Sequence, residues 1–163
     1  MACSREYPER PFFGIGGVVI EHGRALLIRR GSEPLRGEWS IPGGMLELGE
    51  TLEEGVVREL LEETGLRVRV LGLIEVFERI VYANNPVQLR AGAARPRFHY
   101  VIADYLCERL SGEHAAASDV TDVAFARETD LASYNLTPTA LRILHKAFAM
   151  HRAHRPARDT PSA

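Results

Sequence analysis

Gly44–Leu66 has the sequence GMLELGETLEEGVVRELLEETGL, and the expectations for the rest of the chain start from it. Its spacing predicts a loop followed by a helix over Leu52–Thr64. Thr51 is a good N-cap residue, and Glu54 three positions later completes a capping box. Gly65 stands where a left-handed residue commonly ends a helix. Both ends of the predicted helix therefore carry a local signal.

The predicted helix has two chemically distinct sides. The apolar side holds Leu52, Val56, Val57, Leu60 and Leu61. The charged side holds Arg58, Glu59, Glu62 and Glu63. Glu59 and Glu63 are one turn apart, so their carboxylates repel, and we expect both to face solvent. A solvated acidic face is the simple interpretation, but a hard dication such as Mg²⁺ or Mn²⁺ would relieve the repulsion. Gly43 and Gly44 precede the helix, and their bare backbone can approach a metal or a phosphate closely.

The fixed positions of this stretch match a known motif. They are Gly44, then Glu50 after five residues, then Arg58, Glu59 and Leu60 after seven more, and finally Glu62, Glu63, Gly65 and Leu66. This pattern resembles the box of the Nudix (MutT-like) hydrolase family, and Trp39–Gly43 resembles the segment that leads into that box. Many positions are fixed over one continuous run, so the resemblance is specific, although the box covers a small part of the chain.

The resemblance implies an α/β fold, a Nudix-type α/β/α sandwich with a mixed β-sheet between helices. It also implies a Mg²⁺ site, with Mn²⁺ as an alternative ion. Glu59 and Glu63 are the implied principal ligands, Glu62 assists them, and the carbonyl of Gly43 adds a ligand from the loop.

The resemblance assigns the catalytic roles less completely. Arg58 is expected to pair with Glu50 or a helix glutamate and to fix the geometry rather than to touch substrate. The candidates for the general base are Glu62 in the box and the distal residues Glu113, Asp119 and Asp122. Asp122 best matches the acidic residue before the short late strand of relatives, which often have glutamate there. Glu47 is a weaker candidate, for which solvent exposure is the simpler interpretation.

The rest of the chain predicts strands around the helix. The predicted strands are Phe12–Glu21, Arg24–Arg30, Arg67–Tyr82, Arg97–Cys107 and Asp119–Ala126, with a turn at His22 and Gly23. Thr137 caps and Pro138 opens a final helix. Its core side is predicted to hold Leu141, Leu144, His145 and Phe148. Strands on both sides of a helix, then a further strand and a helix, predict a mixed sheet between helices.

We divide the chain into an N-terminal arm over residues 1–11, a Nudix domain over 12–151 and a polar C-terminal tail over 152–163. Residues 83–96 predict a long loop, which in a compact domain is usually functional or disordered. Asp104 lies inside an apolar strand, where an unpaired carboxylate is costly, so we expect it to contact an arginine rather than to act in catalysis.

Candidates for substrate binding come from arginines, aromatic rings and bare backbone. Arg29, Arg30 and Arg36 suit a phosphate or a carboxylate, although solvated surface arginines are the simpler interpretation. Gly44 offers its backbone. The candidates for stacking on a base are Phe77, Tyr82, His99 and Tyr100. Tyr82 stands where the larger ADP-ribose subgroup has proline and where dinucleoside polyphosphate hydrolases have tyrosine, but a core or rim aromatic is the simpler interpretation.

The composition is that of an ordinary globular domain. The chain has 163 residues, 45% of them hydrophobic and 26% charged. A net charge of −2 gives no general attraction to nucleic acid or to a membrane, so the expected partner is a small nucleotide. Cys3 and Cys107 are far apart, which favours a reduced cytoplasmic protein. Residues 1–11 lack the apolar core of a signal peptide, and no run is long enough to span a bilayer.

The resemblance implies a Mg²⁺-dependent pyrophosphohydrolase that cleaves a nucleoside diphosphate linked to another moiety, of the ADP-ribose or nucleotide-sugar type. HYVIADYLC at 99–107 and LTP at 136–138 are similar to the ADP-ribose pyrophosphatase-like branch. One alternative is a MutT-like hydrolase of nucleoside triphosphates or dinucleoside polyphosphates. Another is a nucleotide-sensing Nudix domain that does not hydrolyse, against which the complete set of acidic residues argues. A homodimer is compatible with the resemblance.

Overall fold

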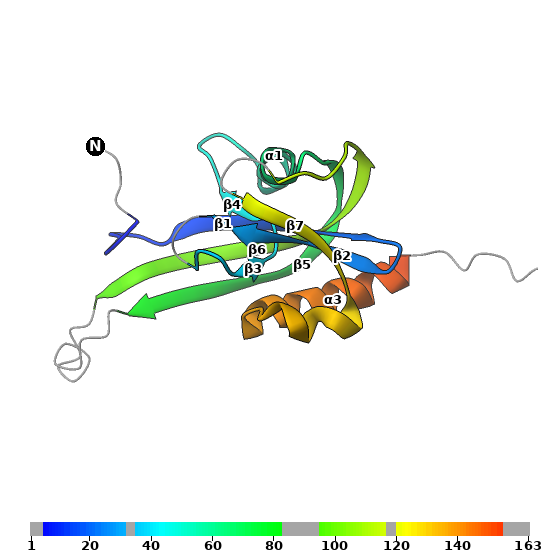
Figure 1. Cartoon of the computed structure of the whole chain (residues 1–163). Coiled ribbons are helices and arrows are strands. Elements are labelled where there is room, and N and C mark those ends of the chain that lie inside the picture. Colours follow the sequence, from blue (N-terminus) through cyan, green and yellow to red (C-terminus); the bar gives the residue numbers. More distant parts are fainter. Residues whose placement is uncertain (1–4, 32–34, 83–94, 117–119, 155–163) are drawn as a thin grey trace, which may run out of the picture.

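A mixed β-sheet lies between two helices in a computed structural model of the chain, which describes residues 5–31, 35–82, 95–116 and 120–154. Helix α1 (Leu52–Thr64) covers one face of the sheet, and helix α3 (Pro138–His154) covers the other (Figure 1). A short 3₁₀ helix, η1 (Glu128–Tyr134), precedes α3. The predicted α/β/α sandwich is therefore confirmed.

The sheet has seven strands among the described residues. They are β1 (Phe12–Glu21), β2 (Arg24–Arg30), β3 (Trp39–Ser40), β4 (Gly43–Met45), β5 (Arg67–Tyr82), β6 (Pro96–Ser111) and β7 (Val120–Arg127). Strand β1 is central, because it pairs with β2, β4 and β6. It runs parallel to β6, while the other pairings are antiparallel, so the sheet is mixed.

Alternating side chains of the sheet build a core on each face. The core under α3 includes Val18, Leu106, Ile143, Leu144 and Phe148. The core under α1 includes Ile15, Val19, Val56, Leu60 and Ala103. Residues Ala25 to Ile28 of β2 are all buried, as their unbroken apolar run predicted.

Helix α1 begins and ends where its local signals predicted. The hydroxyl of Thr51 accepts a hydrogen bond from the Glu54 N–H at 3.3 Å, and the Glu54 carboxylate accepts from the Thr51 N–H at 2.8 Å. Gly65 has a φ of 72° and donates its N–H to the carbonyl of Leu61 at 3.0 Å. These bonds satisfy backbone groups that the helix leaves unpaired at its ends.

Strand β6 is longer than the predicted strand, which ended at Cys107. Residues Glu108 to Ser111, predicted as part of a loop, continue the antiparallel pairing with the start of β5. Glu108 lies opposite Arg69, and their side chains form an ion pair at 2.5 Å. Pairing with a distant strand therefore extends β6 through residues whose local sequence is polar.

Helix α3 differs from its prediction in length and in its buried side. It continues to His154, beyond the boundary placed at residue 151. Ile143 and Ala147 are buried together with Leu144 and Phe148, whereas His145 is exposed and lies 3.1 Å from Glu128. The prediction that His145 faces the core is therefore wrong.

The N-terminal arm lies beside the start of β6 over its described part. The Tyr7 N–H donates to the carbonyl of Arg97 at 2.8 Å, and Glu6 pairs with the Arg97 guanidinium at 2.8 Å. Most of the predicted 83–96 loop and of the 152–163 tail lies outside the described residues. Within the described ranges, no helix combines the length and the apolarity of a membrane span.

Candidate active site

Arg58 connects the glutamates of α1 to the loop that precedes the helix. Its Nε donates to Glu50 at 2.6 Å, and its Nη1 donates to Glu59 at 2.8 Å and to Glu62 at 3.3 Å. Its Nη2 donates to the carbonyl of Met45 at 3.0 Å. The hydrogen bond from Arg58 holds the pKa of Glu50 below its usual range, and the same bond raises the pKa of Arg58. The predicted pairing of Arg58 with Glu50 and with helix glutamates is confirmed.

Glu59 and Glu63 point toward the glycines of β4 and not toward solvent. The Glu59 carboxylate lies against Gly44, where a Cβ would come within 2.6 Å of Oε2 and closer still to Oε1. The Gly43 N–H donates to Glu63 Oε2 at 2.8 Å, and Glu63 is only 5% exposed. The expectation that both glutamates face solvent is wrong, because the β4 backbone packs against this side of the helix.

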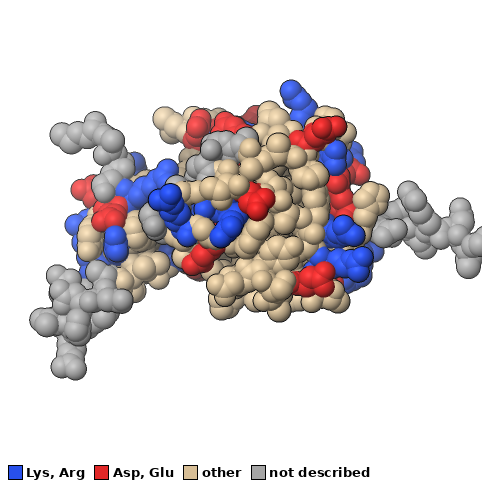
Figure 2. Space-filling model, viewed as in Figure 1, with Lys and Arg blue, Asp and Glu red and all other residues tan. Residues whose placement is uncertain are grey.

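A cavity of about 410 Å³ lies on the α3 face of the sheet, next to β4. Strands β1, β4, β5 and β6 and the first turn of α3 contribute to its lining, which includes Gly43, Gly44, Phe77, Tyr100, Asp104 and Thr137. Gly43 and Gly44 therefore border the cavity and also contact the glutamates of α1. Figure 2 shows acidic side chains gathered over α1 and basic side chains over the neighbouring left part of the view.

The NUDIX domain family model matches residues 11–147, which include β1, Arg58 with its glutamate partners, and most of α3. The chain belongs to the Nudix family. This Nudix chain is 33% identical to an ADP-ribose pyrophosphatase of Methanocaldococcus jannaschii over 115 residues, which are 71% of this chain and 61% of that protein. It is 52% identical to a MutT-like protein of Streptomyces ambofaciens over 65 residues, which are 39% of this chain and 40% of that protein. The chain thus spans less than two thirds of the length of these two relatives.

Among solved structures, the Nudix chain is similar to the MutT NUDIX hydrolase of Burkholderia pseudomallei. The TM-score is 0.70 and the identity is 28%, over 85% of this chain and 98% of that chain. The predicted membership of the Nudix family is confirmed by these matches.

The Nudix glutamates have the chemistry that a hard divalent cation requires. All the predicted ligands are oxygen atoms, and Gly44 leaves space that a side chain would take from Glu59. In the described part of the chain, no three His, Cys, Asp or Glu side chains converge at metal-ligand spacing. Arg58 binds Glu59 and Glu62 in this arrangement, and Gly43 binds Glu63. These residues fit a divalent cation in type and position. To bind the same cation, however, the carboxylates must turn away from Arg58 and the Gly43 N–H.

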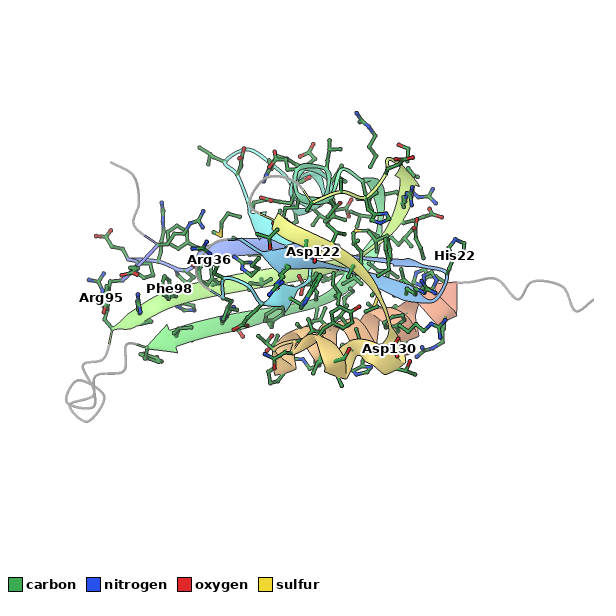
Figure 3. All side chains as sticks on the ribbon, viewed as in Figure 1. His22, Arg36, Arg95, Phe98, Asp122 and Asp130 are labelled. Atoms are coloured by element: carbon green, nitrogen blue, oxygen red, sulfur yellow. The ribbon has the colours of Figure 1, made fainter. Side chains whose placement is uncertain are left out.

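The candidate general bases lie in different places around α1. Glu62 is 52% exposed at its side chain and bonded to Arg58. Glu113 lies beside the C-terminal end of α1, where its carbonyl approaches Gly65. Asp122 is exposed on β7 and accepts the Val123 N–H at 2.9 Å (Figure 3). Asp119 lies outside the described residues.

The predicted substrate residues divide into two groups. Phe77, Gly44, Tyr100 and Arg30 line the cavity. The described residues Arg29, Arg36, Tyr82 and His99 do not line it. The Nε of Arg29 donates to the carbonyl of Gly37 at 2.9 Å, and the exposed Arg36 lies on the loop between β2 and β3 (Figure 3). Their roles in binding stay predictions, as do those of Tyr82 and His99. Arg79 and Thr137 also line the cavity, and the sequence did not identify them as site residues. Their position depends on the pairing of β5 with β6 and on where α3 packs.

Asp104 has a different environment from the one that the sequence predicted. It is 4% exposed, and no arginine in the described residues forms an ion pair with it, so the predicted arginine contact is wrong. Burial, and next the nearby Glu75 carboxylate, raises the pKa of Asp104 to about 7. Glu75 is itself held by α3, through Arg142 at 2.7 Å and through Lys146.

Proposed function

We propose that this Nudix protein is a Mg²⁺-dependent pyrophosphohydrolase that cleaves a nucleoside diphosphate joined to another group, of the ADP-ribose or nucleotide-sugar type. The products are a nucleoside monophosphate and a phosphorylated second product. The observation that carries this proposal is the position of β4, whose Gly43 and Gly44 border the cavity and contact Glu63 and Glu59. We propose that a nucleotide in the cavity extends its phosphates past this strand toward the glutamates.

Hydrolysis of a phosphoanhydride needs neutralisation of the diphosphate charge and a positioned water molecule. Glu59, Glu63, Glu62 and the Gly43 carbonyl would hold a Mg²⁺ or Mn²⁺ ion, which would supply positive charge and activate a bound water. Arg58 keeps the carboxylates in position through its bonds to Glu50, Glu59 and Glu62. We propose Glu62 or Asp122 as the base that takes the proton from the water, with Glu113 as a further candidate.

The cavity supports a nucleoside as the part of the substrate that is held away from the metal. Its volume of about 410 Å³ is within the range of small-molecule sites. Phe77 and Tyr100 offer aromatic surfaces, and Arg30 and Arg79 offer positive charge at the border of the same space. This combination suits a base with attached phosphates.

The relatives favour the same substrate class. One similar protein is named an ADP-ribose pyrophosphatase, and its similarity covers 71% of this chain. A MutT-like protein has a higher identity, 52%, but over only 39% of the chain. A MutT-like hydrolase of nucleoside triphosphates or dinucleoside polyphosphates is therefore the second candidate.

A phosphate-release panel tests the proposal with ADP-ribose, NADH, diadenosine polyphosphates and nucleoside triphosphates in the presence of Mg²⁺. ADP-ribose or a nucleotide sugar is expected to be the best substrate. The double variant Glu59→Gln/Glu63→Gln is expected to lose at least about 100-fold in turnover, because it removes two carboxylate ligands of the cation whose charge neutralises the diphosphate. Glu53→Gln, at an exposed position of α1, is the matched control and should keep the parent rate. Parent activity in the double variant would refute the metal assignment, and tight ADP-ribose binding without turnover would indicate a sensor.

A further inference from the structure

Asp104 sits in the cavity at the centre of three neighbouring strands. In the register of the sheet it lies between Gly16 of β1 and Glu75 of β5. Its carboxyl covers Gly16, where a Cβ would come within 3.3 Å of Cγ and closer still to Oδ1. Since Gly16 has no side chain, the carboxyl occupies that space and borders the cavity.

The carboxyl of Asp104 has no hydrogen-bond or ion-pair partner among the described residues. The residue is only 4% exposed, yet no fully buried side-chain oxygen in those ranges lacks a partner, so the carboxyl oxygens are open to the cavity that Asp104 lines. The charged group that acts on it is Glu75, a like charge. Buried polar groups in proteins are normally paired, so a lone carboxyl at a cavity wall is well placed to pair with a ligand.

We propose that Asp104 recognises the substrate's base, through paired hydrogen bonds between its carboxyl and the N1 and 6-amino edge of adenine. The inference rests on the proposed function for one premise only, that a nucleotide occupies the cavity. A protonated carboxyl has one O–H donor and one carbonyl acceptor side by side. The adenine edge presents the complementary acceptor and donor, N1 and the 6-amino group.

The surroundings of Asp104 favour the protonated form that this pairing needs. Burial and the Glu75 charge raise the pKa of Asp104 to about 7, so the neutral acid is well populated near neutral pH. Arg142 and Lys146 of α3 face the same region but are bound to Glu75. Arg30 and Arg79 border the cavity and place positive charge at its rim.

Phe77 supplies a surface for the face of the same base. It lies on the strand next to Asp104, two residues along from Glu75, with its partner Ile102 on the same face of the sheet. Diagonal neighbours of this kind are roughly 7–8 Å apart, which is within reach of a bicyclic base. The guanidinium of Arg142 lies 5.9 Å from the centre of the Phe77 ring and helps to hold it.

The test compares the binding of two nucleotides by titration calorimetry, with the full chain and Mg²⁺. The probes are AMP and purine riboside 5′-monophosphate, which lacks the 6-amino group. The parent protein is expected to prefer AMP by about tenfold, because the second nucleotide leaves the Asp104 carbonyl unpaired. Asp104→Ala should lower this preference to about one, and Asp104→Asn should keep most of it, since an amide also has a donor and an acceptor.

Equal binding of the two nucleotides by the parent protein would overturn the proposal without any variant. An equal loss for both nucleotides in Asp104→Ala would also overturn it, because it would place the contact on the sugar or in the fold. The Tm of each variant is measured beside the titration. Binding of AMP does not require hydrolysis, so a protein that binds AMP in this way but does not cleave ADP-ribose would refute only the proposed function.

Discussion

Gly44→Ala is expected to damage the active site while leaving the fold intact. A Cβ at this position would lie within 2.6 Å of one oxygen of Glu59 and closer to the other, whereas ordinary contact begins at 3.4 Å. The Glu59 carboxylate must therefore move by about 1 Å, and a displacement of this size at a catalytic group typically costs about 100-fold in rate. We expect turnover of ADP-ribose to fall by about this factor.

The stability of Gly44→Ala should change little, for two opposing reasons. The displaced group is the end of a flexible side chain, which can rotate at small cost. Alanine also restricts the unfolded chain, which stabilises a protein by about 0.4–1 kcal/mol where the backbone conformation permits it. Urea unfolding should therefore give a free energy within about 1 kcal/mol of the parent value.

The assay is steady-state release of AMP from ADP-ribose, with Gly72→Ala as the matched control. Gly72 lies on β5, and a Cβ there would meet nothing closer than Met150 at 3.9 Å, so this variant should keep the parent rate. If Gly44→Ala turned over ADP-ribose at the parent rate, the position of the Glu59 carboxylate beside β4 would have no part in the reaction. A similar loss in both variants would show that the sheet, and not the carboxylate, is responsible.

Two further substitutions, removal of the metal and a change of pH each have an expected outcome. Arg58→Lys should lower turnover by about 100-fold and stability by about 1–2 kcal/mol, because an ammonium cannot replace the forked bonds of the guanidinium; kcat and urea unfolding measure these effects. Thr51→Ala should cost about 1 kcal/mol and lower the Tm by about 3 °C without changing kcat, since it removes only the helix cap. Chelation with EDTA should abolish turnover, and Mg²⁺ or Mn²⁺ should restore it; activity that survives EDTA would contradict the metal site. Burial, and next Glu75, raises the pKa of Asp104 to about 7, so the unfolded chain gives up this proton at lower pH than the folded chain, and stability should fall as pH rises from about 4 to about 7. Chemical unfolding at several pH values should show this fall in the parent and a smaller one in Asp104→Asn.

The elements that the sequence predicted well have signals within a few residues of their ends. Helix α1 is bounded by the Thr51 capping box and by Gly65, and both act through local hydrogen bonds. The turn at His22 and Gly23 likewise separates β1 and β2 at the predicted residues. The pattern of acids after Arg58 was sufficient to indicate the family, because spacing along one helix fixes which side chains are neighbours.

The features that the sequence did not predict depend on contacts between distant segments. The end of β6 is set by its pairing with β5, which no local pattern contains. The burial of Glu63 depends on the position of β4 against α1, and hydrophobic spacing does not reveal it. The sequence predicts an arginine contact for Asp104. The fold instead places Asp104 beside a cavity, which exists only once the strands have assembled.

The two glycines of β4 act as a partition one peptide thick between the carboxylates of α1 and the cavity. A partition without side chains has no rotamer to change, so covalent geometry fixes its thickness. A substrate that contacts both the cavity and the carboxylates of α1 must pass around the edge of β4. This requirement sets a minimum length for a substrate that can be cleaved. Nucleotides shorter than this length should occupy the cavity, remain uncut and act as competitive inhibitors.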